Sequence, residues 1–112
     1  VESIITSSSD EKLNRCKTLG ATHLINYKTT PNWGSAAKKL TGGRGVDTVV
    51  EVGGQATLSE SMAAVRFAGH IAIVGIVGGF DGAPFMPAML IGNSVRIQGL
   101  SVGSREQFEE MN

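Results

Sequence analysis

Short runs of apolar and β-branched residues alternate with helical patterns along the chain, and the candidate strands begin roughly 21 to 25 residues apart. This spacing is typical of units in which each strand is followed by a helix that returns the chain to the same end of a parallel sheet. We therefore expect an α/β fold with a doubly wound parallel sheet. The predicted strands are Glu2–Thr6, His23–Asn26, Asp47–Glu51, His70–Gly75 and Val95–Gly99.

Three of the predicted helices begin right after a strand with a capping box, in which a Ser or Thr is followed three positions later by Glu or Gln. The boxes are Ser8-x-x-Glu11, Thr57-x-x-Glu60 and Ser104-x-x-Gln107. The first helix should end at Gly20, because glycine readily takes the left-handed conformation that closes a helix. Another helix is predicted over Asn32–Leu40, where the apolar residues share one face.

The stretch from Gly78 to Asn93 interrupts this rhythm, because it contains Pro84 and Pro87 and is longer than most connections in α/β proteins. We expect an irregular excursion there, with a short apolar helix at Ala88–Ile91. Its methionines and aliphatic residues, Met86, Met89, Leu90 and Ile91, suit the core.

The composition supports one packed domain and excludes several classes of partner. Hydrophobic residues make up 41% of the 112 residues, while Lys+Arg and Asp+Glu both number 10, so the formal net charge is zero. We expect no nucleic-acid partner without a basic face, and no membrane partner without an apolar run of roughly 18 residues. The one cysteine, Cys16, cannot form an internal disulfide, which favours a cytoplasmic location.

In a parallel sheet the carboxyl end of every strand and the amino end of every following helix lie at the same edge, which makes that edge suitable for binding a nucleotide. The predicted edge consists of Thr6–Ser9, Val52–Gly54, Gly75–Gly79 and Leu100–Gly103. Glycine is concentrated there, and its missing side chain allows the close approach of a flat ring or a phosphate. The pattern therefore predicts a nucleotide ligand.

The residues that end the first predicted strand indicate which nucleotide is bound. An acidic side chain there would hold a ribose 2′-hydroxyl and repel a 2′-phosphate, but this chain has Ser7–Ser9. Three hydroxyls, a helix amino end and Lys12 favour a phosphate, with Tyr27 placed to cover it, although two acidic residues precede Lys12. The alternative interpretation is that Ser8 only caps the helix and Lys12 only faces solvent.

No catalytic or metal-binding motif is visible in the chain. There is no G-x-G-x-x-G sequence, no P-loop, and no spacing of His, Cys, Asp and Glu that suits zinc. Cys16 shares an apolar helix stripe with Leu13, while His23 and His70 begin strands at the edge opposite the predicted ligand. We therefore predict no catalytic and no metal-binding residue in this segment.

Four stretches, which together cover nearly the whole chain, resemble the cofactor domain of the medium-chain dehydrogenase/reductase family, which includes zinc-type alcohol dehydrogenases and quinone reductases. They are Ile4–Asn26, Gly42–Gly54, Gly69–Gly79 and Ile97–Gly103, and the first runs into the sequence K-T-L-G-A-T-H-L-I-N-Y. The resemblance implies a Rossmann-like fold, and for the apolar residues of the excursion it implies a dimer interface as an alternative to the core. It also implies an oxidoreductase that transfers hydride between a nicotinamide cofactor and an alcohol or aldehyde, or an enone or quinone.

The residue pattern and the resemblance together assign the cofactor contacts. NADP is favoured over NAD, and the first two strand ends are expected to hold its 2′-phosphate. The later strand ends are expected to contact the riboses and the nicotinamide. The candidate cofactor-binding residues are Ser7, Ser8, Ser9, Lys12, Tyr27, Val52, Gly53, Val74, Gly75, Ile76, Leu100, Ser101 and Val102.

The sequence departs from the family pattern because the first strand, its glycine fingerprint, and the catalytic domain with the zinc ligands and substrate pocket are missing. Val1 already falls in a strand pattern and Asn112 in a helical one, so we expect an inactive fragment of a homo-oligomeric enzyme, whose zinc content the segment leaves open. Loss of the central strand would leave a gap of about 9.6 Å, or two strand spacings, in the sheet. The expected ways to close this gap are rearrangement, pairing with another copy, or a longer polypeptide.

Two other classes of protein share parts of the pattern. A nucleotide-sensing regulatory domain has a similar E-K-L and L-G-A pattern and would bind its ligand without catalysis. A methyltransferase shares the doubly wound sheet, but it usually has an acidic residue at the position of Ser7. Both remain alternatives to the oxidoreductase.

Overall fold

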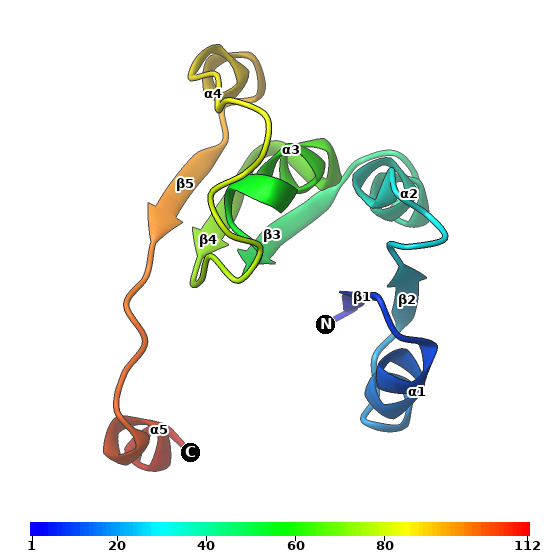
Figure 1. Cartoon of the computed structure of the whole chain (residues 1–112), viewed down its shortest axis with the longest axis vertical. Helices are drawn as coiled ribbons and strands as arrows, with labels where there is room; N and C mark the ends of the chain where they lie inside the picture. The colour runs from blue at the N-terminus through cyan, green and yellow to red at the C-terminus, as the bar shows by residue number, and fades with distance from the viewer.

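The chain folds into alternating strands and helices, and the computed structural model describes all 112 residues (Figure 1). This order confirms the predicted α/β class, and the bounds of β2 agree with the prediction. The elements are β1 (Ile4–Ser7), α1 (Asp10–Thr18), β2 (His23–Asn26), α2 (Trp33–Leu40), β3 (Val46–Glu51), α3 (Gln55–Ala64), β4 (Val65–Ile73), α4 (Ala88–Asn93), β5 (Arg96–Gly99) and α5 (Arg105–Met111).

All hydrogen-bonded strands run parallel, but they form two sheets. β1 pairs with β2, from Ile4 opposite His23 to Ser7 opposite Asn26, while β3, β4 and β5 form a second sheet in that order. Because β1 does not pair with β3, the chain does not close the predicted gap by joining these two strands. Figure 1 shows the two sheets as separate parts of the molecule, with α2 on the path of the chain from one to the other.

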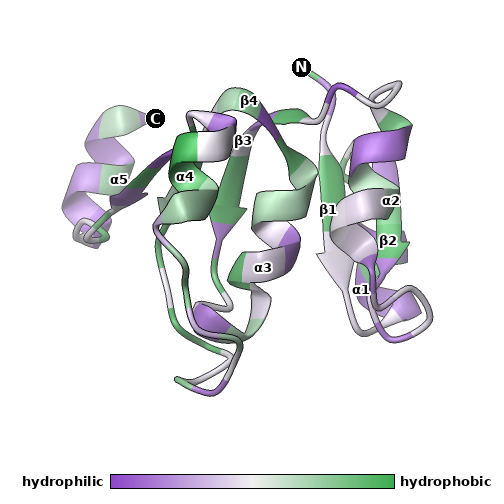
Figure 2. Cartoon of the chain, turned by 90° about the horizontal axis from the view of Figure 1, so that it is seen from above, coloured by the Kyte–Doolittle hydropathy of each residue, from purple (hydrophilic) through white to green (hydrophobic).

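Two apolar clusters hold the elements together. One covers the three-stranded sheet, where Met62 of α3 packs with Ile71 of β4. The other joins the two sheets, because Ile25 of β2 and Ala37 of α2 pack with Ala64 at the end of α3. Figure 2 shows hydrophobic residues along the strands, whereas α5 is mostly hydrophilic and has no buried residue.

The close contact between α2 and α3 depends on Gly34. A Cβ atom at this position would lie 2.1 Å from the carbonyl oxygen of Glu60, so only glycine allows the two helices to approach this closely. The Gly34 N–H also donates a hydrogen bond of 2.7 Å to Oε2 of Glu60. The two sheets are therefore linked by packing and by a polar contact at the same place.

The helix starts differ from two of the three predicted capping boxes. The box at Ser104 is present, with both of its hydrogen bonds to Gln107. The first helix is capped by Ser9 and not by Ser8. The Ser7 hydroxyl accepts a hydrogen bond from the Ser9 N–H, and this local turn places the helix start one residue later than predicted. α3 begins at Gln55 without a side-chain cap, because the hydroxyl of Thr57, inside the helix, contacts β3 instead.

The fourth strand was predicted over His70–Gly75, but β4 extends over Val65–Ile73. Its first part is irregular, because Val46 lies opposite Val65 while Thr48 lies opposite His70, so that four residues of β4 match one of β3. His70 therefore lies inside the strand and does not begin it. β1 and β5 begin at Ile4 and Arg96, within two residues of the predicted starts.

The segment after β4 is the predicted irregular excursion, and its short helix α4 ends at Asn93, two residues later than expected. Leu90 packs against the cluster of the three-stranded sheet. Met86, Met89 and Ile91 are exposed. The core interpretation is thus confirmed for Leu90 alone.

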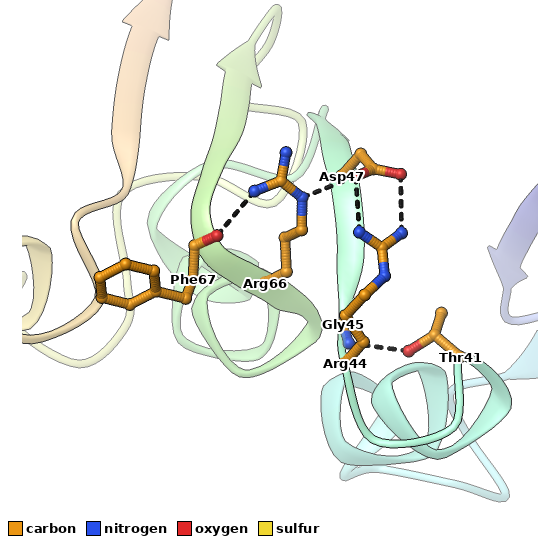
Figure 3. Close-up of polar contacts among 6 residues, drawn as sticks. All are labelled: Thr41, Arg44, Gly45, Asp47, Arg66 and Phe67. Carbon is orange, nitrogen blue, oxygen red and sulfur yellow. Dashed lines mark hydrogen bonds and ion pairs between the residues drawn. The ribbon is translucent and has the colours of Figure 1, made fainter.

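Side-chain ion pairs connect the start of β3 to β4 at the edge opposite the strand carboxyl ends (Figure 3). Arg44 forms a bidentate contact with Asp47, at 2.9 and 3.0 Å, and the Arg66 Nε donates to the same carboxylate at 2.6 Å. These bonds, first from Arg44 and then from Arg66, hold the pKa of Asp47 far below its usual range. Arg44 is thus held in an ion pair, although its side chain remains 59% exposed.

Candidate functional site

The candidate cofactor-binding residues lie at the carboxyl ends of the parallel strands, in two groups. One group belongs to the two-stranded sheet and the other to the three-stranded sheet, so the gap between the sheets separates them. The first group is Ser7, Ser8, Ser9, Lys12 and Tyr27. The second is Val52, Gly53, Val74, Gly75, Ile76, Leu100, Ser101 and Val102.

Local hydrogen bonds hold the first group together. The Ser7 hydroxyl accepts from the Ser9 N–H at 3.2 Å, and the Ser9 hydroxyl accepts from the Lys12 N–H at 3.4 Å. Tyr27 follows β2 directly, and its N–H donates to the Ser7 carbonyl at 3.1 Å. The Ser7 and Ser9 hydroxyls only accept in these bonds and the Ser8 hydroxyl has no partner within the chain, so all three O–H groups can still donate to a ligand, and Ser8 alone is free of any restraint.

Negative charge next to this group opposes the binding of a phosphate. Asp10 and Glu11 lie in the first turn of α1, where they offset the positive end of the helix dipole. Asp10 is held in place by Asn26, whose Nδ2 donates to Oδ1 at 2.7 Å. The sequence showed the acidic residues, but not that Asn26 at the end of β2 fixes one of them.

In the second group, two loops continue the parallel pairing beyond the ends of β3 and β4. Val74 donates its N–H to the carbonyl of Glu51 at 2.9 Å, Val77 to Val52 at 3.0 Å, and Gly78 to Gly53 at 2.9 Å. The segments Val52–Gly54 and Gly75–Gly79 are therefore hydrogen-bonded to each other and not only placed at the same edge.

Several glycines of this edge are required by the contact between the two loops. A Cβ atom at Gly75 would lie 3.0 Å from the Val52 carbonyl oxygen, and one at Gly78 would lie 2.8 Å from that of Gly53. Gly54, with a φ of 82°, would place a Cβ 3.0 Å from the Ile76 Cα. These glycines, which we expected to admit a cofactor, already serve the packing of one loop on the other.

The outer side of this edge combines exposed apolar side chains with free backbone donors. Ile76, Leu100 and Val102 are 51%, 44% and 80% exposed. The N–H groups of Gly75, Ile76 and Val102 have no hydrogen-bond acceptor within the chain. An apolar surface with unpaired donors suits a flat heteroaromatic ring that carries an amide group, so the residues fit a nicotinamide.

An apolar cavity of about 340 Å³ lies beside this surface. Its lining includes the exposed Ile76 and Phe85 and the half-buried Leu58, Ile73 and Leu90. Three of these residues also pack against the core cluster of the three-stranded sheet, so the cavity is a partly filled extension of that core.

Sequence reasoning missed Glu51, the buried acidic residue at the end of β3. Its carboxyl group accepts hydrogen bonds from the N–H groups of Gly53 and Gly54 and from the hydroxyls of Thr57 and Ser61. The available signal was an acidic residue that ends a strand directly before two glycines, with hydroxyl residues one turn apart on the next helix.

The chain's own residues do not fit a zinc site. No group of three or more His, Cys, Asp and Glu side chains lies close enough together to hold a metal ion. The structure also has no helix of the length and apolar character that crossing a membrane demands.

Comparison with known proteins agrees with this geometry. The family model described as zinc-binding dehydrogenase matches residues 2–112. A zinc-type alcohol dehydrogenase-like protein of Schizosaccharomyces pombe is 44% identical over 110 residues, which are 96% of this chain and 32% of that protein.

Solved structures agree as well. An NAD-dependent alcohol dehydrogenase superposes with a TM-score of 0.86 at 31% identity, over 98% of this chain and 32% of that one. A mycobacterial protein complexed with NADPH gives a TM-score of 0.78 at 28% identity, over 98% of this chain and 33% of that one. The chain thus spans about a third of the length of these relatives, and by the match of nearly all its residues it belongs to the zinc-binding dehydrogenases of the medium-chain dehydrogenase/reductase family.

Proposed function

We propose that the chain is the cofactor-binding part of an oxidoreductase and that it binds NADP(H) in preference to NAD(H). The observation that carries this proposal is the exposed edge of β4 and β5, where apolar side chains surround free N–H donors. Family membership supports a nicotinamide cofactor, since one structural neighbour is described as NAD-dependent and another is complexed with NADPH.

Each group of residues has a role in this proposal. Ser8, with support from Lys12 and Tyr27, binds the 2′-phosphate, while Val52 and Gly53 lie along the riboses. The donors at Gly75 and Ile76 bind the carboxamide, and the residues after β5 support the same ring.

The chain's part in the reaction is to orient the nicotinamide ring and to shield it from water. The cofactor, when bound, supplies or accepts the hydride that the whole enzyme exchanges with an alcohol, aldehyde, enone or quinone. The exposed apolar side chains exclude water from one face of the ring, and the backbone donors fix its orientation. The substrate itself would be held by residues of a further domain.

The preference for NADP(H) is tested by Ser8→Asp. The added carboxylate would repel a 2′-phosphate, so we expect NADPH affinity to fall by roughly tenfold, or about 1.4 kcal/mol, with NADH affinity unchanged or higher. Nicotinamide fluorescence titration measures both dissociation constants.

Ser35→Asp is the matched control, because Ser35 is an exposed residue in the first turn of α2 and lies outside the candidate site. It should leave both affinities unchanged. An equal loss of both nucleotides in Ser8→Asp would argue against a phosphate at Ser8, and a wild-type protein that binds neither would refute the proposed function.

A further inference from the structure

Glu51 is a buried carboxyl group whose two oxygens are both hydrogen-bonded. Its side chain lies at the end of β3, where the residue is only 3% exposed. Oε1 accepts from Gly53 N–H at 2.7 Å, from Gly54 N–H at 3.0 Å and from Thr57 Oγ1 at 2.5 Å. Oε2 accepts from the Ser61 hydroxyl. All the hydrogen bonds of this buried acidic side chain are therefore made to groups within the chain.

Two of these donors, the N–H groups of Gly53 and Gly54, belong to the peptide units whose carbonyls bind the loop Gly75–Gly79. A peptide unit is planar and trans, so its N–H and its C=O point in opposite directions. When Gly53 N–H points at Glu51, the Val52 carbonyl points away from it and accepts from Val77 N–H. The next unit repeats the arrangement, with its N–H on Glu51 and its carbonyl on Gly78 N–H.

We propose that Glu51 is a positioning residue for the cofactor edge. By orienting two consecutive peptide units, its carboxyl group keeps Gly75–Gly79 against Val52–Gly54 and so fixes the surface around Ile76. Its effect on nucleotide affinity rests on the function proposed above, whereas its effect on the loops does not.

The arrangement requires an acceptor, and Gln supplies one with the same shape. In Glu51→Gln the remaining Oε1 keeps its three donors, and the Ser61 hydroxyl can reverse and accept from the new amide. In Glu51→Ala both glycine N–H groups lose their partner inside the protein, which removes the restraint on the two peptide units. Ser61→Ala is the matched control, because it removes a bond to Oε2 and leaves the peptide units untouched.

The test is amide hydrogen exchange of the full chain, followed residue by residue by NMR. We expect Glu51→Ala to speed the exchange of Val77 and Gly78 by at least about tenfold, because local opening becomes easier. The amide of Ile25 in β2 should not change. Glu51→Gln and Ser61→Ala should stay within about threefold of the wild type at all three amides.

Unchanged exchange at Val77 and Gly78 in Glu51→Ala would overturn the proposal, and so would an equal rise at every amide, which reports global loss of stability. If Glu51→Ala does not fold, Glu51→Asp replaces it. Aspartate keeps the charge but shortens the side chain by one methylene, so the same local acceleration is expected and its absence counts against the proposal.

Nucleotide titration of the same variants separates this proposal from the one above. Glu51→Ala should weaken NADPH and NADH by the same factor, because the 2′-phosphate group at Ser8 is unaffected, while Glu51→Gln should restore both. Equal affinities in the wild type and Glu51→Ala would refute the positioning role for the cofactor. Failure of the wild type to bind either nucleotide would refute only the proposed function, since the exchange result decides the role of Glu51 in the loops.

Discussion

Ala68 holds a backbone conformation that its side chain disfavours. Its φ is 55°, in the irregular first part of β4, and its side chain is exposed. An L-residue with a Cβ atom is strained there by about 1–2 kcal/mol, and glycine is not. The residue therefore stores strain that the rest of the strand must offset.

Ala68→Gly is expected to raise the free energy of unfolding by up to about 1 kcal/mol, because relief of this strain exceeds the entropy that glycine adds to the unfolded chain. Urea unfolding followed by circular dichroism measures the change. Ala56→Gly is the control, because Ala56 is exposed within α3, where glycine should destabilise by about 0.5–1 kcal/mol. A loss of stability in Ala68→Gly would contradict the prediction.

A helix-capping pattern in the sequence predicts the structure where no distant group competes for the hydrogen bonds of the capping side chain. Ser104 forms the predicted capping box because it lies at the exposed start of α5 and has no other partner. The Thr57 hydroxyl bonds to Glu51, six residues earlier in the chain, and this contact forms only after β3 and α3 pack together. Glu51 itself was overlooked for the same reason, since its burial depends on the fold.

At the scale of elements, periodicity located every strand and helix, but not the irregular part of β4. The residues between Val65 and His70 contain Ala68 and Gly69, which suggest a turn, and only the pairing of Val65 with Val46 makes them part of the strand. The ion pairs of Asp47 stabilise this irregular stretch. Asp47 lies in β3 and binds both Arg66 of β4 and Arg44, which precedes β3. One carboxylate thus joins two neighbouring elements.

Asp47→Asn should lower stability at neutral pH, and the difference from the wild type should disappear in acid. The pKa of Asp47 is lower in the folded chain than its ordinary value of 3.8, so its contribution is fully present above that value and is lost as the pH falls below it. Unfolding curves at pH 7 and in strong acid measure both differences.

The control for this prediction is Glu109→Gln, which removes an exposed ion pair with Arg105 within α5. It should change stability little at any pH, because a single solvated pair on a helix contributes little. A difference between Asp47→Asn and the wild type that persists at low pH would show that the carboxylate charge is not what stabilises this region.

At the scale of the whole molecule, the two sheets depend on the contact of α2 with α3. The strands of the two sheets share no hydrogen bonds, and the cluster around Ile25 and Ala64 is the apolar link between them. The order of elements predicted both halves, and the resemblance to the family, whose central strand is missing here, predicted the gap. It did not show that Gly34 allows the linking helices to meet, because that depends on their distance in space.

Gly34→Ala is expected to destabilise the chain by about 1–3 kcal/mol, because the added methyl group forces α2 and α3 apart. Gly92→Ala, in α4, is the control, since a Cβ there meets nothing within 4 Å and should be tolerated. Thermal unfolding of both variants measures the difference, and equal stabilities would contradict the role assigned to Gly34.

The division into two sheets also bears on how the chain folds. Every hydrogen-bonded strand pair joins strands that are neighbours in the sequence, β1 with β2, β3 with β4 and β4 with β5. Each pair is parallel and needs a crossover connection, but none of these connections passes through the other sheet, so each half contains all the strand pairing of its own sheet. The α2–α3 contact is then what couples the two halves, so weakening it should let one sheet open without the other.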